Sequence, residues 1–188
     1  MRITLKKIIL VGAMLLSAVF FLLAVATPIT VKAAGLFGGE VKASLLGCAS
    51  GKPLNDVFAV SYTGSSIDGY KAWVDGCNGT LAVFGVISLI LIIFDFLAIV
   101  GGFFLPTPAA ARKLIIPFMA ISIVLLPIGM IVFAVLTNVT YSANGYSMTL
   151  SQSNPGIMFI MYVLGIVFFI GALIASGVVS EKVFVGKK

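Results

Sequence analysis

LAVFGVISLILIIFDFLAIVGGFFL, residues 81–105, is an apolar run that contains one ionisable side chain, Asp95. About 20 consecutive apolar residues are enough for a helix to cross the hydrocarbon core of a bilayer. Three other runs, 8–26, 114–136 and 156–179, are also long enough. The four runs predict an all-α membrane protein, built as a four-transmembrane-helix bundle.

The composition of the whole chain supports this class. Of the 188 residues, 61% are hydrophobic and 10% are charged, whereas soluble domains are about half apolar and about a quarter charged. Little chain separates the runs, so we expect a single tetraspan domain over residues 1–188. Its expected segments are spans at 8–26, 81–105, 114–136 and 156–179, outer loops at 27–80 and 137–155, an inner loop at 106–113 and a tail at 180–188.

The first run can also be read as a signal peptide. Lys6 and Lys7 precede it, and Ala24-Val25-Ala26 is similar to a small-residue cleavage site. The apolar core of a signal peptide is typically about 7–15 residues long, and this run is longer. We therefore favour a retained first helix.

Basic residues mark one side of the membrane. The positive-inside rule places both termini and loop 106–113 in the cytoplasm, and we expect the plasma membrane. The formal net charge of +6 is mostly this flanking charge. We therefore expect membrane lipid as a partner and no nucleic acid. The basic residues used here are Arg2, Lys6, Lys7, Arg112, Lys113, Lys182, Lys187 and Lys188.

The first outer loop holds both cysteines, Cys48 and Cys77. An even pair on the oxidising side of a membrane predicts a disulfide. The alternative is two free thiols in a reducing compartment. VFAVSY, residues 57–62, has the composition of a β-strand, and KAWV, residues 71–74, is a second candidate.

The second outer loop contains TYSANGYSMT, in which Asn144 and Gly145 predict a two-residue hairpin turn. A lone hairpin is marginally stable in water. We therefore expect both outer loops to share a small antiparallel β-sheet, pinned by the disulfide. A free edge of that sheet would accept a strand from a neighbouring molecule.

Asn78 and Asn138 each stand in an Asn-x-Thr sequon for glycosylation. Both fall on the expected outer face, in agreement with the topology. Both also abut the end of a span, where access is poor, so their use stays open.

Asp95 lies about 15 Å from the cytoplasmic end of its span, at about 1.5 Å per residue. Ser17 and Ser122 fall at a similar depth. An isolated carboxylate in this position is costly. We expect a protonated Asp95 hydrogen-bonded to Ser17 or Ser122. The alternatives are a basic group on another subunit, a lipid, and an ion or proton path.

The chain contains no histidine, and its two cysteines are far apart in sequence. Hydroxyl groups without a neighbouring base make poor nucleophiles. No glycine-rich phosphate loop precedes a lysine. We therefore expect no enzymatic activity, no cofactor and no metal.

The overall plan resembles the claudin-like tetraspans, a group that includes claudins, the peripheral myelin protein relatives and amastins. It shares four spans, both ends inside, a long first outer loop with two cysteines and a short cysteine-free second loop. Thr27-Pro28-Ile29 is similar to the end of the first amastin helix. The closely spaced cysteines of these families are absent, since 29 positions separate Cys48 from Cys77.

The expected function is that of a non-enzymatic tetraspan membrane protein. It would organise a membrane assembly or a surface contact through lateral and outer-loop interactions. We expect a homo-oligomer or association with other membrane protein subunits. One alternative is an accessory subunit of a larger membrane complex, and a further one is an oligomeric pore.

Overall fold

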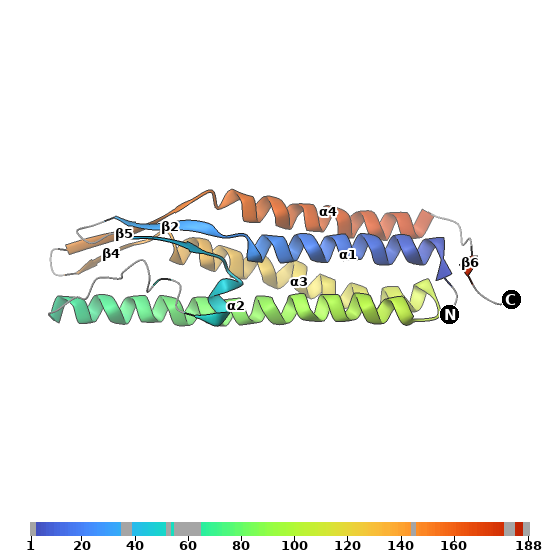
Figure 1. The fold of residues 1–188 in the computed structure, drawn as a ribbon, viewed down its shortest axis with the longest axis horizontal. Helices are drawn as coiled ribbons and strands as arrows, with labels where there is room; N and C mark the ends of the chain where they lie inside the picture. The colour runs from blue at the N-terminus through green and yellow to red at the C-terminus, as the bar shows by residue number, and fades with distance from the viewer. Residues whose placement is uncertain are drawn as a thin grey trace. The chain divides into compact units, whose positions relative to one another are not determined.

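The computed structural model describes residues 3–34, 39–51, 54, 65–143, 146–178 and 183–185. Four long helices and short strands make up this part of the chain (Figure 1). The helices are α1 (Leu5–Ala26), α2 (Ser65–Phe104), α3 (Pro108–Leu136) and α4 (Gly156–Val178), with a 3-10 turn η1 (Gly47–Ser50). The strands are β1 (Ile3–Thr4), β2 (Ile29–Ala34), β3 (Glu40–Ala43), β4 (Thr140–Ala143), β5 (Tyr146–Ser153) and β6 (Val183–Val185).

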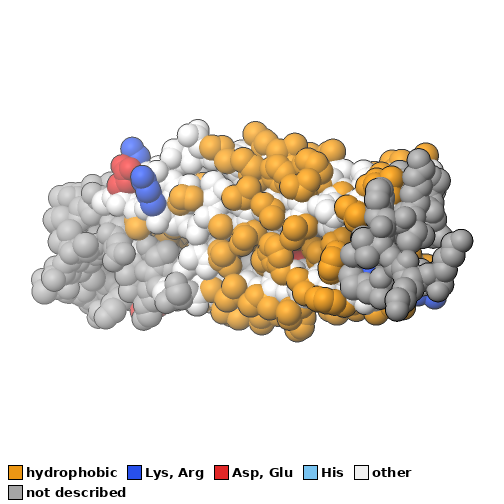
Figure 2. All heavy atoms as spheres, turned by 45° about the vertical axis from the view of Figure 1, so that its right-hand side comes forward, with side chains coloured by type: hydrophobic (Ala, Val, Ile, Leu, Met, Phe, Trp, Pro, Cys, Tyr) orange, Lys and Arg blue, Asp and Glu red, His pale blue; other side chains and the backbone are white. Residues whose placement is uncertain are grey.

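Each of the four helices is long and apolar enough to cross a membrane. Large hydrophobic side chains remain exposed on them, for example Leu97 at 59% and Val124 at 61% of their full exposure. Figure 2 shows a broad area of such side chains on one face of the molecule. This surface suits contact with lipid chains, which solvate apolar groups as well as a protein core does.

Helix α2 begins much earlier than the apolar pattern predicts. It starts at Ser65, whereas the expected span started at Leu81. The prediction of a strand at 71–74 is therefore wrong, because these residues are helical. Contacts of this polar stretch favour the helix: the ring of Trp73 stacks on that of Tyr141 at 5.0 Å, and Asn78 accepts a hydrogen bond from the Leu54 amide.

The chain forms two compact units. Unit 1 comprises the described parts of Met1–Ala24, Ile90–Leu126 and Phe159–Lys188. It contains segments of all four helices, together with the antiparallel pair of β1 and β6. Its core includes fully buried Leu10, Met14, Phe21 and Met119.

Unit 2 comprises the described parts of Val25–Leu89 and Pro127–Met158. It holds an antiparallel sheet with the strand order β3-β2-β5-β4. Along β2, exposure alternates with period two: Ile29, Val31 and Ala33 are buried, while Lys32 and Ala34 are exposed. The sheet packs on α3 partly through Gln152, whose amide donates to the Ala134 carbonyl at 3.0 Å.

The small antiparallel sheet confirms that part of the expected fold, but the predicted disulfide is wrong. Cys48 and Cys77 are both buried free thiols. The backbone of Cys48 packs against Gly85 of α2. Cys77 lies eight residues earlier in α2, about 12 Å along the helix axis, whereas disulfide-linked Cα atoms lie about 4.4–6.8 Å apart.

Two other predicted features fall outside the described residues. One is the strand at 57–62, and the other is the turn at Asn144 and Gly145. The described strands on either side of that turn pair with Ala143 opposite Tyr146.

Candidate functional site

Asp95 is fully buried in unit 1, and it lies on α2. Among the described residues, neither of its carboxyl oxygens has a hydrogen-bond partner. A buried polar group without a partner forfeits the hydration it had in water, at a cost of about 1–3 kcal/mol and more when it is charged. In the described part of the chain, Asp95 contributes two of the three buried side-chain oxygen or nitrogen atoms that have no partner.

Ser122 of α3 lies next to Asp95. Its hydroxyl is also fully buried and has no hydrogen-bond partner in the described residues. A close contact sets the register of the two helices, because a Cβ at Gly102 would lie 2.7 Å from Cδ1 of Ile115. Asp95 stands seven residues before Gly102, and Ser122 seven residues after Ile115, so the antiparallel helices bring them to the same level.

Two further polar side chains from α1 and α4 lie in the same unit. Ser17 donates a hydrogen bond from its hydroxyl to the Gly165 carbonyl at 2.7 Å. Tyr162 donates from its hydroxyl to the carbonyl of Ile123, the residue after Ser122. The rings of Tyr162 and Phe21 also stack, with centroids 5.6 Å apart.

Each helix therefore supplies one buried polar side chain to a set that we call the polar layer: Ser17, Asp95, Ser122 and Tyr162. Ser17 and Tyr162 are satisfied by backbone carbonyls of facing helices. Of the two partners expected for Asp95, Ser17 bonds elsewhere, and Ser122 lies beside Asp95 with no hydrogen bond of ordinary geometry between them. The sequence analysis missed Tyr162, although a tyrosine in the middle of an apolar run is a visible signal.

Two basic side chains that were expected only as flanking charge also bond to helix carbonyls in unit 1. Lys7 is 1% exposed, and its ammonium group donates to the Leu105 carbonyl at 2.5 Å. Arg112 donates to the Leu173 carbonyl at 3.2 Å. Leu105 directly follows the last residue of α2, where a cation is stabilised by the orphan carbonyls and the helix dipole.

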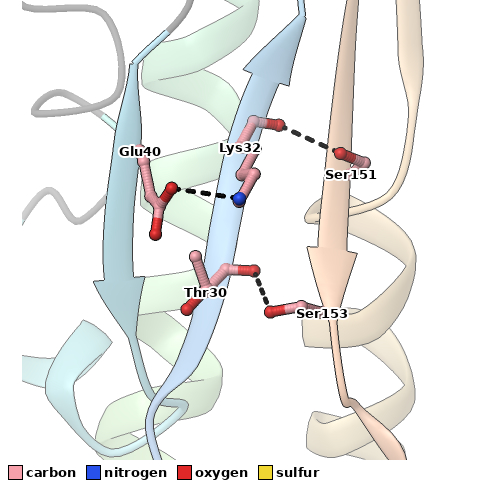
Figure 3. Close-up of polar contacts among 5 residues, drawn as sticks. All are labelled: Thr30, Lys32, Glu40, Ser151 and Ser153. Atoms are coloured by element: carbon pink, nitrogen blue, oxygen red, sulfur yellow. Dashed lines mark hydrogen bonds and ion pairs between the residues drawn. The ribbon is translucent and has the colours of Figure 1, made fainter.

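The second candidate site is the outward face of the sheet in unit 2. Figure 3 shows Lys32 paired with Glu40, and the hydroxyls of Ser151 and Ser153 directed at carbonyls of β2. The Lys32 nitrogen and the Glu40 carboxylate oxygen lie 3.2 Å apart. Except for Ala34, all residues of this face are polar: Thr30, Lys32, Glu40, Lys42, Thr140, Ser142, Ser147, Thr149, Ser151 and Ser153.

The two edges of the sheet differ in charge. Edge strand β3 carries Glu40 and Lys42 on the outward face, whereas edge strand β4 carries Thr140 and Ser142. Charged side chains on an edge strand discourage pairing with another chain. Strand β4 lacks that protection.

The two sequons lie in different surroundings. Asn78 is 2% exposed inside α2, where its side-chain oxygen accepts a hydrogen bond from the Leu54 amide at 3.1 Å. This placement disfavours Asn78 as a glycan acceptor. Asn138 is exposed just after α3, and its use stays a prediction.

The cysteines are poor candidates for chemistry. Burial raises the pKa of the Cys48 thiol to about 12, and its sulfur donates to the Ser44 carbonyl at 3.1 Å. A thiol is nucleophilic only as the thiolate, so this group is unreactive near neutral pH. In the described ranges, no three His, Cys, Asp or Glu side chains cluster as metal ligands would.

No protein-family model, no curated protein and no solved structure matches this chain.

Proposed function

We propose that this protein is a non-enzymatic tetraspan that organises a membrane assembly by pairing with a second copy of itself through strand β4. The observation that carries the proposal is the contrast between the charged edge β3 and the uncharged edge β4. The plan of a claudin-like tetraspan agrees with this role, and it rests on architecture alone.

The backbone of β4 is suited to accept another strand. The Leu150 amide donates to the Val139 carbonyl at 2.8 Å, so these opposed residues form a hydrogen-bonded pair. Such pairs alternate along an antiparallel ladder. The N–H and C=O groups of Thr140 and Ser142 therefore point away from β5, where a neighbouring strand would meet them.

A second copy is the occupant that fits this edge best. An antiparallel pairing of β4 with β4 has two-fold symmetry, so each copy uses the same surface and the assembly closes as a dimer. No charged side chain of β4 would be brought against its own copy, since the strand is Thr-Tyr-Ser-Ala. Helices lying in one membrane would hold the two sheets at the same height.

We infer that this contact lies outside the cell. The positive-inside rule favours cytoplasmic termini, and with that orientation the sheet would lie on the opposite side of the plasma membrane. An accessory role through Asp95 finds less support, because a carboxyl that is fully buried in its own unit is not presented to a partner helix.

The test uses matched proline substitutions on the two edges. Ser142→Pro removes an N–H that points away from β5, so the β4–β5 ladder keeps its hydrogen bonds. Lys42→Pro is the matched control on β3. The Ala33 amide donates to the Gly39 carbonyl, and the same alternation turns the Lys42 N–H away from β2.

Native mass analysis in mild detergent or native nanodiscs gives the oligomeric state. We expect a dimer for the wild type and for Lys42→Pro, and a monomer for Ser142→Pro. A dimer that survives Ser142→Pro overturns the β4 contact. A foreign subunit in fixed ratio, with no second copy, overturns self-pairing and makes this an accessory chain.

A further inference from the structure

Three oxygen atoms of the polar layer have no hydrogen-bond partner among the described residues: both carboxyl oxygens of Asp95 and the hydroxyl oxygen of Ser122. All three are fully buried, and they come from facing positions on α2 and α3. Two adjacent side chains that both lack a hydrogen-bond partner differ from one isolated side chain, because a single bound ion can contact both.

Among the described residues of unit 1, the positive side chains are bonded elsewhere or lie near the ends of the helices. On α1, Lys7 is bonded to the Leu105 carbonyl, and Lys6 lies one residue nearer the chain terminus. On α3, Arg112 is bonded to the Leu173 carbonyl, and Lys113 is exposed. The titratable group from α4 is Tyr162, a neutral phenol that donates to Ile123.

An ionised Asp95 would therefore be a bare negative charge in a water-poor interior, which costs several kcal/mol. The missing charge is one positive unit. The missing contacts are those of hard oxygen ligands, two from a carboxylate and one from a hydroxyl. Carboxylate, hydroxyl and carbonyl oxygens suit protons and hard metal cations, and they suit soft metals poorly.

We propose that Asp95 and Ser122 form a binding site for one small monovalent cation, a proton or Na⁺, which exchanges with the surrounding water. With a proton, an O–H bond forms on the Asp95 carboxyl and donates to Ser122. With Na⁺, the carboxylate and the hydroxyl oxygen coordinate the ion. Either ion neutralises the charge. Na⁺ would contact all three oxygens, whereas the proton would bond one carboxyl oxygen and link it to Ser122. The site is independent of the pairing of β4.

Infrared difference spectroscopy on the purified protein in nanodiscs reads this site directly, because a protonated carboxyl and a carboxylate absorb at different frequencies. One arm changes pH at constant salt. The other replaces choline by Na⁺ at constant pH and ionic strength. The variants are Asp95→Asn, which keeps the size of the side chain and removes the titratable group, and Ser122→Ala, which removes one ligand. Ser17→Ala is the matched control, since Ser17 is a buried hydroxyl that bonds elsewhere.

We expect the wild type and Ser17→Ala to show a carboxylic-acid band that converts to carboxylate in at least one arm. Asp95→Asn should lack the band, and Ser122→Ala should shift its frequency or weaken the response. Conversion with rising pH alone identifies a proton, and conversion with Na⁺ identifies the metal ion.

Two results overturn the proposal. The first is an acid band that changes in neither arm, which would make Asp95 a permanently neutral structural group. The second is a conversion that persists in Asp95→Asn, which would assign the response to another carboxyl. If Asp95→Asn does not fold, the frequency shift in Ser122→Ala still decides whether the band belongs to this pair.

Discussion

Unit 1 buries the hydroxyl of Ser17 and bonds it to the Gly165 carbonyl at 2.7 Å. Unit 2 leaves Ser151 and Ser153 exposed, with long contacts of 3.5 and 3.4 Å to carbonyls of β2. Water can replace the contacts of an exposed hydroxyl, whereas a buried hydroxyl depends on its protein partner. We therefore expect the hydroxyl of Ser17 to contribute more to the stability of the fold than those of Ser151 and Ser153.

The two units also use glycine differently. In unit 2, a Cβ at Gly85 would lie 2.5 Å from the Ala49 nitrogen and 2.8 Å from the Leu45 oxygen, which are backbone atoms. In unit 1, a Cβ at Gly165 would lie 2.5 Å from the ring of Phe21. Backbone atoms move less readily than a side chain does. We therefore expect a methyl group added at Gly85 to destabilise the fold more than one added at Gly165.

The rate of alkylation of the buried Cys48 thiol should show the largest effect of burial. A pKa raised from 9.0 to about 12 lowers its thiolate fraction near neutral pH about a thousandfold. We expect alkylation of Cys48 to be at least that much slower in the folded protein than after denaturation. Mass analysis of the alkylated peptides measures both rates. Equal rates would show that the thiol is accessible.

The same shift has a consequence for stability at high pH. The folded-state pKa lies above the ordinary value, so the contribution of Cys48 is fully present below about pH 9 and is lost as pH rises toward about 12. We expect this loss to disappear in Cys48→Ala. Unfolding followed by Trp73 fluorescence measures it in both proteins.

Gly85→Ala should be the most damaging of the small substitutions. The added methyl group meets the backbone of residues 45–49, and we expect a loss of roughly 2–4 kcal/mol in the free energy of unfolding. Gly79→Ala in the same helix is the control, because nothing lies within 4 Å of its Cβ. That control should be neutral or stabilising. Equal effects in a chemical denaturation series would refute the close contact.

Gly165→Ala tests the corresponding contact in unit 1. The methyl group meets the buried ring of Phe21, and we expect a loss of roughly 1–3 kcal/mol. The control is Gly171→Ala, whose Cβ has open space. If Gly165→Ala costs more than Gly85→Ala, the argument that backbone yields less than a side chain fails.

Ser17→Ala and Ser151→Ala compare the two hydroxyls directly. We expect a loss of about 0.5–1.7 kcal/mol for Ser17→Ala, the range found for hydrogen bonds between membrane helices. For Ser151→Ala we expect a change within about 0.5 kcal/mol. Thermal unfolding of both variants in one detergent makes the comparison, which an equal cost would contradict.

The ion pair of Lys32 and Glu40 should have the smallest effect. Both side chains are more than half exposed, at 58% and 54%. We expect a coupling energy of about 0.2–1 kcal/mol, near the lower limit because solvent and salt screen the pair. A double-mutant cycle with Lys32→Ala and Glu40→Ala at low and high salt measures it. A larger, salt-independent coupling would mean that the pair is less hydrated than its exposure indicates.

Much of unit 1 is predictable from sequence, because apolar length alone selects its helices. Asp95, Ser17 and Ser122 were expected at one depth, and the structure buries all three in that unit. The partners were not predictable. Ser17 bonds to a carbonyl 148 residues away, and Tyr162 to one 39 residues away. Every residue has a backbone carbonyl, so no sequence pattern indicates which carbonyl will accept a given hydrogen bond.

Unit 2 is less predictable, since its parts are stabilised by contacts between distant segments. The sequence analysis did not name the strand β2, although its alternation is typical of one. It assigned Ser65 to Thr80 to an outer loop with a strand candidate at 71–74, whereas the stretch is helical. Its glycines and polar residues have modest helix propensity, which tertiary contacts override. The cysteine count suggested a disulfide, but the packing of η1 on Gly85 separates the two thiols along α2.

The sequence by itself determined that four helices are long and apolar enough to cross a membrane and that the segments between them contain a sheet, because both follow from local periodicity and length. Only the tertiary structure decided which buried polar groups find partners. That depends on the register between helices, set by close contacts at Gly102 and Gly165. Asp95 and Ser122 lie side by side, and neither has a hydrogen-bond partner in the described part of the chain. A linear sequence does not record that relation.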